Sequence, residues 1–305
     1  MPIRIAIVGV GKIARDQHMP SIAADGRFEL AAGVSRQLPG DLRVPAFRDL
    51  GELLASQVEV DAAAICTPPS VRHAIALEAM EAGLDVMLEK PPAATLGEIE
   101  HLERVARDGG RVLFAAWHSQ ANQAVDEARD LLADQAIRAL RVEWWEDARK
   151  WHPGQNWLFE PSGFGVFDPG INALSILSRI LPEPLFVRDA QLSIPANRQA
   201  PIAARLDFGE GKSADMDFRH TTGEHWTIRV ETDAGRTVVL EEGGARLIVD
   251  GEERVGLERA EYPALYARFA ELVDARTSDV DREPLRIVAD AMLVARRETV
   301  EAFEW

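Results

Sequence analysis

The segment IRIAIVGVGKIA (residues 3–14) decides how the first part of the chain folds. Its first six residues, 3–8, are an apolar run rich in β-branched side chains, which suits a strand buried on both faces of a sheet. Gly9 permits a tight turn, Gly11 allows a ligand to approach the backbone, and small Ala14 lets the next helix pack closely. Because a helix N-terminus attracts anions, this order predicts a diphosphate-binding turn, with an ordinary glycine turn as the alternative.

Further strands alternate with helices up to about residue 120. Apolar runs at 28–35, 60–69, 85–90 and 111–119 are separated by segments of helical character, such as 70–83, which ends at a glycine. This alternation predicts a doubly wound parallel sheet with helices on both faces, an α/β Rossmann domain over residues 1–120. Ligands of such sheets bind at the carboxyl ends of the strands, where Thr67, Lys90 and His118 are found.

The second strand ends at Ser35 and Arg36, where dinucleotide sites that select NAD usually carry a carboxylate for the ribose. A hydroxyl and a guanidinium can instead bind a 2′-phosphate, so we expect NADP to be accepted alongside NAD. The alternative is that Arg36 is a solvated loop residue. The candidate cofactor contacts, of which Ser35, Thr67 and Glu89 are assigned by position alone, are Gly9, Gly11, Lys12, Ile13, Ser35, Arg36, Thr67, Pro68, Glu89 and Lys90.

The pattern changes after residue 120. A helix at 121–133 and a strand at 137–146 are followed by a helix at 171–181, and then by short alternating runs between 186 and 251 that end in glycine turns. Two closing helices start near Tyr262 and Pro284. We expect residues 121–305 to form an α+β domain with an open-faced, mostly antiparallel sheet, whose uncovered face is buried in a homodimer or higher homo-oligomer.

The segment WWEDARKWHPGQNWLFEPSGFGVFDPGIN (residues 144–172) concentrates aromatic rings and polar tips. Flat rings cover the C–H faces of a sugar, while carboxylate, imidazole and amide groups pair with its hydroxyls. The segment therefore predicts a sugar site. The alternative is a core strand followed by a loop that carries aromatic and polar side chains without binding a ligand. The polar candidates are Glu146, His152, Asp168 and Asn172.

The composition narrows the class of partner. The 305 residues carry a net charge of −16, which argues against a nucleic-acid backbone or an anionic membrane and favours a small neutral substrate. A single cysteine, Cys66, cannot form an internal disulfide, and the apolar start is too short for a signal or membrane segment. We expect a cytoplasmic protein without a metal, since no short histidine spacing indicates one.

The strings GVGKIA, LEKPP and DPGIN resemble the glucose–fructose oxidoreductase and inositol dehydrogenase (Gfo/Idh/MocA) family over the whole chain. Longer strings, GKIARDQHMPSI, MLEKPPAATLGE, WHPGQNW and GVFDPGINALSI, are similar to bacterial aldose 1-dehydrogenases that act on L-arabinose and D-galactose. The resemblance implies an NAD(P)-dependent oxidoreductase that oxidises the anomeric carbon of the sugar to a lactone by hydride transfer. The alternatives are an inositol or polyol dehydrogenase and a regulator that binds NAD(P) without turnover.

Many members of that family carry an aspartate and a histidine four residues apart, where this chain has Asp168 and Asn172. Because an amide cannot accept the proton, Asp168 becomes the candidate base and Asn172 a group that orients the anomeric hydroxyl. Asp168 before a proline could instead be a helix N-cap. Lys90 would stabilise negative charge on O1.

The same resemblance assigns four positions to the sugar pocket: His118, Glu146, Trp151 and His152. For His118, a hydrogen-bonded core histidine is the alternative.

Overall fold

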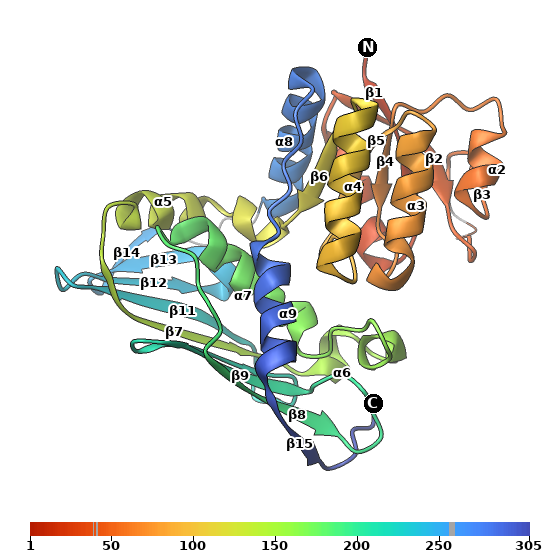
Figure 1. Ribbon diagram of the computed structural model, residues 1–305. Helices are drawn as coiled ribbons and strands as arrows, with labels where there is room; N and C mark the ends of the chain where they lie inside the picture. Colours follow the sequence, from red (N-terminus) through yellow and green to blue (C-terminus); the bar gives the residue numbers. More distant parts are fainter. Residues whose placement is uncertain (39, 41, 256–259) are drawn as a thin grey trace. The chain divides into compact units, whose positions relative to one another are not determined.

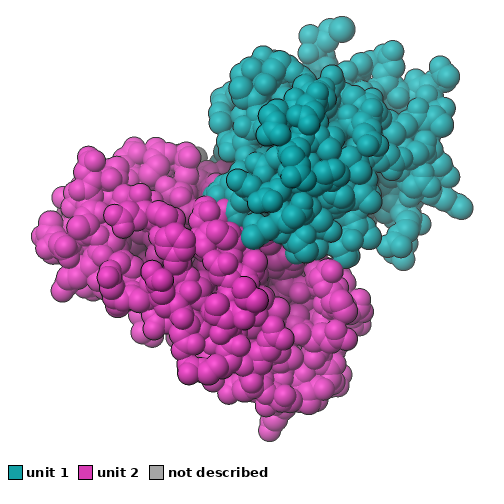
Figure 2. Space-filling model, viewed as in Figure 1, with its two compact units in different colours: residues 1–118, 260–282 teal, residues 119–259, 283–305 magenta. Residues whose placement is uncertain are grey.

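The computed structural model describes residues 1–38, 40, 42–255 and 260–305, and the chain divides into two compact units (Figures 1 and 2). Unit 1 comprises Met1–His118 and Ala260–Arg282, and unit 2 comprises Ser119–Arg259 and Glu283–Trp305. The first segment of unit 1 ends close to the expected boundary at residue 120. Residues 260–282, which the sequence analysis placed in the second domain, belong to unit 1.

Unit 1 contains a six-stranded, entirely parallel sheet with the strand order β3-β2-β1-β4-β5-β6 (Figure 1). This parallel sheet, in which the strand order reverses at β1, confirms the Rossmann prediction. The strands are β1 (Ile3–Val8), β2 (Phe28–Val34), β3 (Ala46–Phe47), β4 (Ala62–Ile65), β5 (Asp85–Glu89) and β6 (Leu113–Ala116). The helices are η1 (Ala14–His18, a π-helical turn), α1 (Met19–Ala24), α2 (Leu50–Leu54), α3 (Pro69–Glu81), α4 (Leu96–Gly109) and α8 (Glu261–Ala275).

Helix α8 joins unit 1 because its aromatic side chains complete the core there. Phe269 stacks between Phe28 of β2 and Phe114 of β6, with ring centroids 6.2 Å apart in both pairs. Tyr266 meets the edge of Phe28 at 5.2 Å. The apolar face of α8 is therefore buried against elements that precede it by some 150 to 240 residues in the sequence, as their residue numbers show.

Unit 2 is built on a nine-stranded sheet with the order β14-β13-β12-β11-β7-β10-β9-β8-β15. Only the β7–β10 and β8–β15 pairs are parallel, which confirms the expected mixed, mostly antiparallel sheet. The strands are β7 (Ile137–Trp145), β8 (Asp189–Pro195), β9 (Ala203–Gly209), β10 (Lys212–Asp217), β11 (His225–Thr232), β12 (Thr237–Glu241), β13 (Arg246–Val249), β14 (Glu252–Val255) and β15 (Arg296–Val300). The helical elements are η2 (His118–Ala121), α5 (Gln123–Leu132), α6 (Ala148–Trp151), η3 (Asn156–Phe159), α7 (Phe167–Ile180), η4 (Glu242–Gly244) and α9 (Glu283–Val294).

Helix α7 is almost completely buried and packs closely against the central strands of this sheet. A Cβ at Gly170 would lie 2.3 Å from the sulfur of Met216 in β10, so a glycine is needed where helix and strand meet. This packing fixes the first turn of α7, which carries Asp168 and, one turn later, Asn172.

The other face of the sheet carries charged side chains in pairs rather than an apolar surface. Arg141 bonds to Glu143 at 2.6 Å, Arg205 to Asp215 at 2.9 Å and Arg138 to Glu231 at 2.7 Å. A second subunit that covers this face, as the sequence analysis expects, must therefore match a pattern of alternating charges.

Candidate active site

The glycine turn after β1 has the geometry that the sequence predicts. Gly9 has φ of +95°, and a Cβ there would lie 2.8 Å from the backbone nitrogen of Thr67. The ends of β1 and β4 thus approach too closely for any other residue. At Gly11, by contrast, no atom of the described residues other than those adjacent in the chain lies within 4 Å of where a Cβ would be, which leaves room for a ligand against the backbone.

Thr67 provides a second observation at this edge. Its Oγ1 atom is buried without a hydrogen-bond partner among the described residues. A buried hydroxyl rarely stays unpaired, so a ligand atom is the natural partner. The residues present therefore fit a bound dinucleotide.

The remaining cofactor candidates lie around the same strand ends. Ile13 is half exposed, and Lys12 is exposed and pairs with Asp16. The Ser35 hydroxyl donates to the carbonyl of Gln37 at 3.1 Å, and Arg36 is exposed. Pro68 occupies the N-cap of α3. Contacts of these residues with a cofactor stay predictions.

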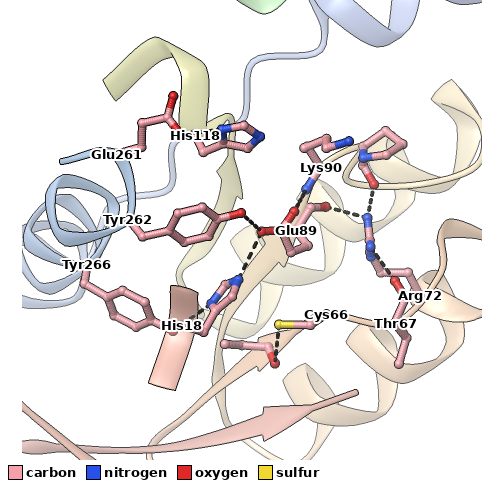
Figure 3. Close-up of polar contacts among 12 residues, drawn as sticks. His18, Cys66, Thr67, Arg72, Glu89, Lys90, His118, Glu261, Tyr262 and Tyr266 are labelled. Carbon is pink, nitrogen blue, oxygen red and sulfur yellow. Dashed lines mark hydrogen bonds and ion pairs between the residues drawn. The ribbon is translucent and has the colours of Figure 1, made fainter. Parts of the chain in front are cut away.

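Glu89, which ends β5, lies at the centre of a buried polar cluster (Figure 3). It is only 4% exposed, and its Oε1 atom is 3.0 Å from Nε2 of His18 and accepts a hydrogen bond of 2.7 Å from the hydroxyl of Tyr262. Its Oε2 atom accepts from the backbone N–H of Lys90 at 2.8 Å. Nδ1 of His18 lies 2.8 Å from the hydroxyl of Tyr266. Contact of this carboxylate with a cofactor stays a prediction.

The neighbouring groups, rather than burial, set the direction of the pKa shifts of His18 and Glu89. Burial alone would lower the pKa of His18, but Cys66, Tyr266 and Glu89 around the ring raise that pKa well above its usual range. Burial would raise the pKa of Glu89, yet the hydrogen bond and charge of His18 outweigh it and hold that pKa at about 2. Burial raises the pKa of Tyr266 to about 12. The cluster is therefore an imidazolium–carboxylate pair between two neutral tyrosines.

The side chain of Arg72 in α3 binds backbone carbonyl groups on both sides of Lys90. Its guanidinium, 2% exposed, donates to the carbonyl oxygens of Glu89, Pro91 and Thr67. Lys90 therefore lies between two carbonyl groups that one buried arginine holds, and its own N–H is held by the Glu89 carboxylate.

His118 follows β6 at the same edge of the sheet. Its ring stacks on Tyr262 with centroids 5.6 Å apart, and its Nδ1 atom is 3.0 Å from a carboxylate oxygen of Glu261. Figure 3 shows the ring on the same side of the cluster as Lys90. It is partly buried and hydrogen-bonded, and its contact with a sugar stays a prediction.

In unit 2, the predicted polar residues Glu146, His152 and Asp168 come together. Nε2 of His152 is 3.7 Å from Oε1 of Glu146 and 3.9 Å from Oδ2 of Asp168, so the imidazole lies between two carboxylates that are 3% and 4% exposed. The indole N–H of Trp226 fixes Glu146 with a hydrogen bond of 2.9 Å to Oε2. This arrangement can accept a proton and pair with several hydroxyls at once.

Helix α7 resolves the alternative for Asp168. The helix begins at Phe167 with Val166 at the N-cap, so the alternative in which Asp168 is the N-cap residue does not hold. The chain is already helical at Asp168 because Phe164, Gly165 and Val166 form turns whose carbonyls accept the first N–H groups. The carboxylate instead lies in the first turn, near His152.

Asn172 is partly buried one turn further along α7, and its Oδ1 atom has no partner among the described residues. An amide oxygen in this state is a ready acceptor for a ligand hydroxyl. Trp151 is 41% exposed, its ring is tilted against that of Trp226 with centroids 5.8 Å apart, and its indole N–H donates to Glu224 at 3.0 Å. Its ring is therefore exposed at the surface of unit 2, where a ligand can contact it.

Sequence reasoning missed the residues that support the two clusters: His18, Arg72, Tyr262 and Tyr266 in unit 1, and Trp226 in unit 2. One signal was present, since Tyr262 and Tyr266 are four residues apart and therefore share a helix face. Their partners are far away in the sequence, and no local pattern connects them.

No group of three or more His, Cys, Asp or Glu residues in the described part of the chain could hold a metal ion. Within the same ranges, every helix is too short or too polar to cross a membrane.

The His18–Glu89 pair predicts how stability depends on pH. Glu89 has a lowered pKa, so its contribution is present above its ordinary pKa of 4.5 and is lost as the pH falls toward 2. His18 has a raised pKa, so its contribution is complete below 6.5 and is lost as the pH rises through the folded-state value. We expect Glu89→Gln to cost about 3 kcal/mol near pH 6 and to flatten the acid limb. Urea unfolding across this range tests it, and an unchanged acid limb would contradict it.

Comparisons with known proteins agree with this geometry. Residues 3–117 match the model of the Gfo/Idh/MocA oxidoreductase family, described as having an NAD-binding Rossmann fold. The chain is 44% identical over 312 residues to galactose 1-dehydrogenase of Pseudomonas fluorescens, with 99% of each chain covered.

Solved structures give the same result. The D-galactose-1-dehydrogenase of Rhizobium etli superimposes with a TM-score of 0.93 at 47% identity, covering 99% of this chain and 98% of that one. A 3-ketoreductase of Actinomadura kijaniata, solved with NADP, shares the fold at 18% identity with a TM-score of 0.83, covering 98% and 100%. The chain therefore belongs to the Gfo/Idh/MocA family, as an NAD(P)-dependent oxidoreductase that acts on a CH–OH group.

Proposed function

We propose that this chain oxidises the anomeric carbon of an aldopyranose, D-galactose or L-arabinose, and releases the sugar lactone. The observation that carries the proposal is the cluster in unit 2, where His152 lies between the buried carboxylates of Glu146 and Asp168. The 44% identity to a galactose 1-dehydrogenase supports the sugar class. D-Galactose and L-arabinose share the hydroxyl arrangement from C2 to C4, so one set of polar groups can bind both.

The residues of unit 2 have separate roles in this proposal. Asp168 accepts the proton of the anomeric hydroxyl, and Asn172 orients that hydroxyl through the amide oxygen that lacks a protein partner. Glu146 and His152 pair with the ring hydroxyls, and Trp151 offers a ring face to the C–H groups.

In unit 1, the glycine turn, Thr67 and the end of β2 would hold the dinucleotide. When bound, its oxidised nicotinamide supplies the hydride acceptor. Lys90 stabilises the negative charge that develops on O1 as the proton leaves. Ser35 and Arg36 would accept a 2′-phosphate, so NADP is used as well as NAD.

Two further proposals concern the state of the protein in the cell. We place it in the cytoplasm, and we propose that the charged face of the nine-stranded sheet is covered by a second copy. The arginine–carboxylate pairs on this face can match their own image across a two-fold axis, because both signs of charge are present on it.

A substrate panel tests the activity directly. We expect absorbance at 340 nm to rise when the protein is mixed with NADP or NAD and D-galactose or L-arabinose, with D-xylose, D-glucose and myo-inositol much slower. The ratio between cofactors reports on Ser35 and Arg36. Preference for myo-inositol would replace the proposal with oxidation of a ring alcohol. Binding of NADPH without turnover of any sugar would contradict the proposed activity.

Replacement of the two ionisable groups tests their roles. We expect Lys90→Ala and Asp168→Asn each to lower kcat about 100-fold or more, because both act on the transition state, with smaller changes in KM. Asp126→Asn, which changes a half-exposed carboxylate on α5, is the control and should stay near wild type. A loss of only a few-fold in both variants would show that the roles are misassigned.

The two glycines of the turn should respond differently. Gly9→Ala places a Cβ against the Thr67 backbone at positive φ, so both stability and NADPH binding should fall. Gly11→Ala meets no protein atom, so its melting temperature should stay unchanged while NADPH affinity drops about 10-fold or more. Fluorescence titration and thermal unfolding measure both. Equal NADPH affinity in Gly11→Ala and wild type would contradict the placement of the diphosphate.

A further inference from the structure

We infer that Glu89, with its buried partners His18 and Tyr262, and Arg72 are positioning residues that hold Lys90 in its reactive place. The inference rests on the proposed role of Lys90. It assigns to Glu89 a task other than contact with the cofactor, namely the fixing of the backbone from which the lysine side chain extends.

The first step is the backbone of the segment 89–91. The N–H of Lys90 donates to Oε2 of Glu89 at 2.8 Å, and the carbonyl groups of Glu89 and Pro91, on either side of Lys90, accept from Arg72. Three backbone groups around one residue are thus bound by two buried charged side chains. Such a segment has little freedom to shift, although it lies at the end of a strand where chains usually loosen.

The second step is the fixing of Glu89 itself. His18 and Tyr262 both bond to Oε1, and the N–H of Lys90 to Oε2, so the carboxylate is oriented by η1, by α8 and by the adjacent backbone. Tyr266 in turn bonds to His18, and Arg72 reaches across to the carbonyl of Thr67. The groups that face His18 are Glu89, Tyr262, Tyr266 and Cys66, and His118 stacks on the far side of Tyr262.

The third step links Lys90 to the cofactor turn. His18 ends the helical turn η1, which starts at Ala14 directly after the glycine turn. Thr67, whose carbonyl is bound by Arg72, is the residue that packs on Gly9. The cluster and Arg72 therefore tie the lysine to both sides of the turn predicted to bind the diphosphate. A small displacement of a catalytic group can lower the rate about 100-fold, which gives such fixing a function.

The chain provides a matched control on the same strand. Asp85 begins β5 as Glu89 ends it, it is also buried, and it pairs with Arg276 at 2.6 Å and accepts from the N–H of Val112. It lies at the amino end of the strand, opposite the ligand edge. Asp85→Asn therefore reports the cost of disturbing a buried ion pair in this sheet without touching Lys90.

The experiment compares Glu89→Gln and Tyr262→Phe with Asp85→Asn. We expect Glu89→Gln to lower kcat about 10- to 100-fold, with KM for D-galactose and Kd for NADPH changed less than about threefold, because a misplaced lysine affects the transition state most. Asp85→Asn should lose thermal stability while kcat stays within about twofold of wild type. Tyr262→Phe removes one hydroxyl and should show an intermediate loss of kcat, so the test survives if Glu89→Gln does not fold.

A second readout needs no turnover. The sequence holds four lysines, Lys12, Lys90, Lys150 and Lys212, so methylation with ¹³C-formaldehyde gives few signals, and Lys90→Arg assigns the one in question. We expect the Lys90 methyl resonance to lie apart from the other three in wild type and in Asp85→Asn, and to move toward them in Glu89→Gln and Tyr262→Phe. The Lys12 resonance serves as the internal reference.

These readouts separate the possible failures. If the Lys90 resonance is the same in all four proteins, or if Asp85→Asn and Glu89→Gln lower kcat equally, the positioning role is wrong. If no sugar is oxidised but the Lys90 resonance responds to Glu89→Gln alone, the proposed substrate is wrong while the positioning of Lys90 stands. If KM rises and kcat does not fall, Glu89 acts in ligand binding and the inference is overturned.

Discussion

The charge of Glu89 is the constraint on which the ligand edge of unit 1 depends. A carboxylate that is 4% exposed costs several kcal/mol unless it is paired and hydrogen-bonded. The donors that offset this cost come from η1, from α8 and from the backbone of Lys90. Both η1 and α8 must therefore adopt fixed positions around the end of β5 for the charge to be tolerated. The same constraint explains why α8, although late in the chain, belongs to unit 1.

Much of the fold could be predicted because its signals are local. The run 3–8, the glycine turn and the strand ends at Thr67 and Lys90 are each recognisable within a dozen residues, and the parallel sheet follows from their alternation. The strands β14 and β15 were missed because the segments Glu252–Val255 and Arg296–Val300 are exposed and charged, as edge strands often are. The short helix α6 lies in the segment read as an irregular loop, where its four residues give too little periodicity to be seen.

The residues of the candidate site also differ in whether a local sequence signal predicts them. Glu146, His152 and Asp168 lie within 23 positions of each other in the sequence and were predicted as a group. The bond from Trp226 to Glu146 spans 80 residues and the one from Tyr262 to Glu89 spans 173, so neither leaves a periodic trace in the sequence. Asp168 was open to a capping role because Asp-Pro at a helix start is common, and only the course of the chain through Phe164–Phe167 shows that the helix begins earlier.

Polar residues with protein hydrogen-bond partners differ in role from buried polar residues that lack a partner in the described chain. Glu89 accepts from three protein groups and so gains its orientation from the protein itself. Thr67 Oγ1 and Asn172 Oδ1 are buried and lack a partner in the described chain, one at the cofactor edge of unit 1 and one in the cluster of unit 2. Leaving such atoms unpaired costs about 1 to 3 kcal/mol each, a cost that a bound ligand would remove. Paired polar groups at these strand and helix ends thus fix the scaffold, and under the proposed function the cofactor and the sugar would supply the partners that Thr67 and Asn172 lack.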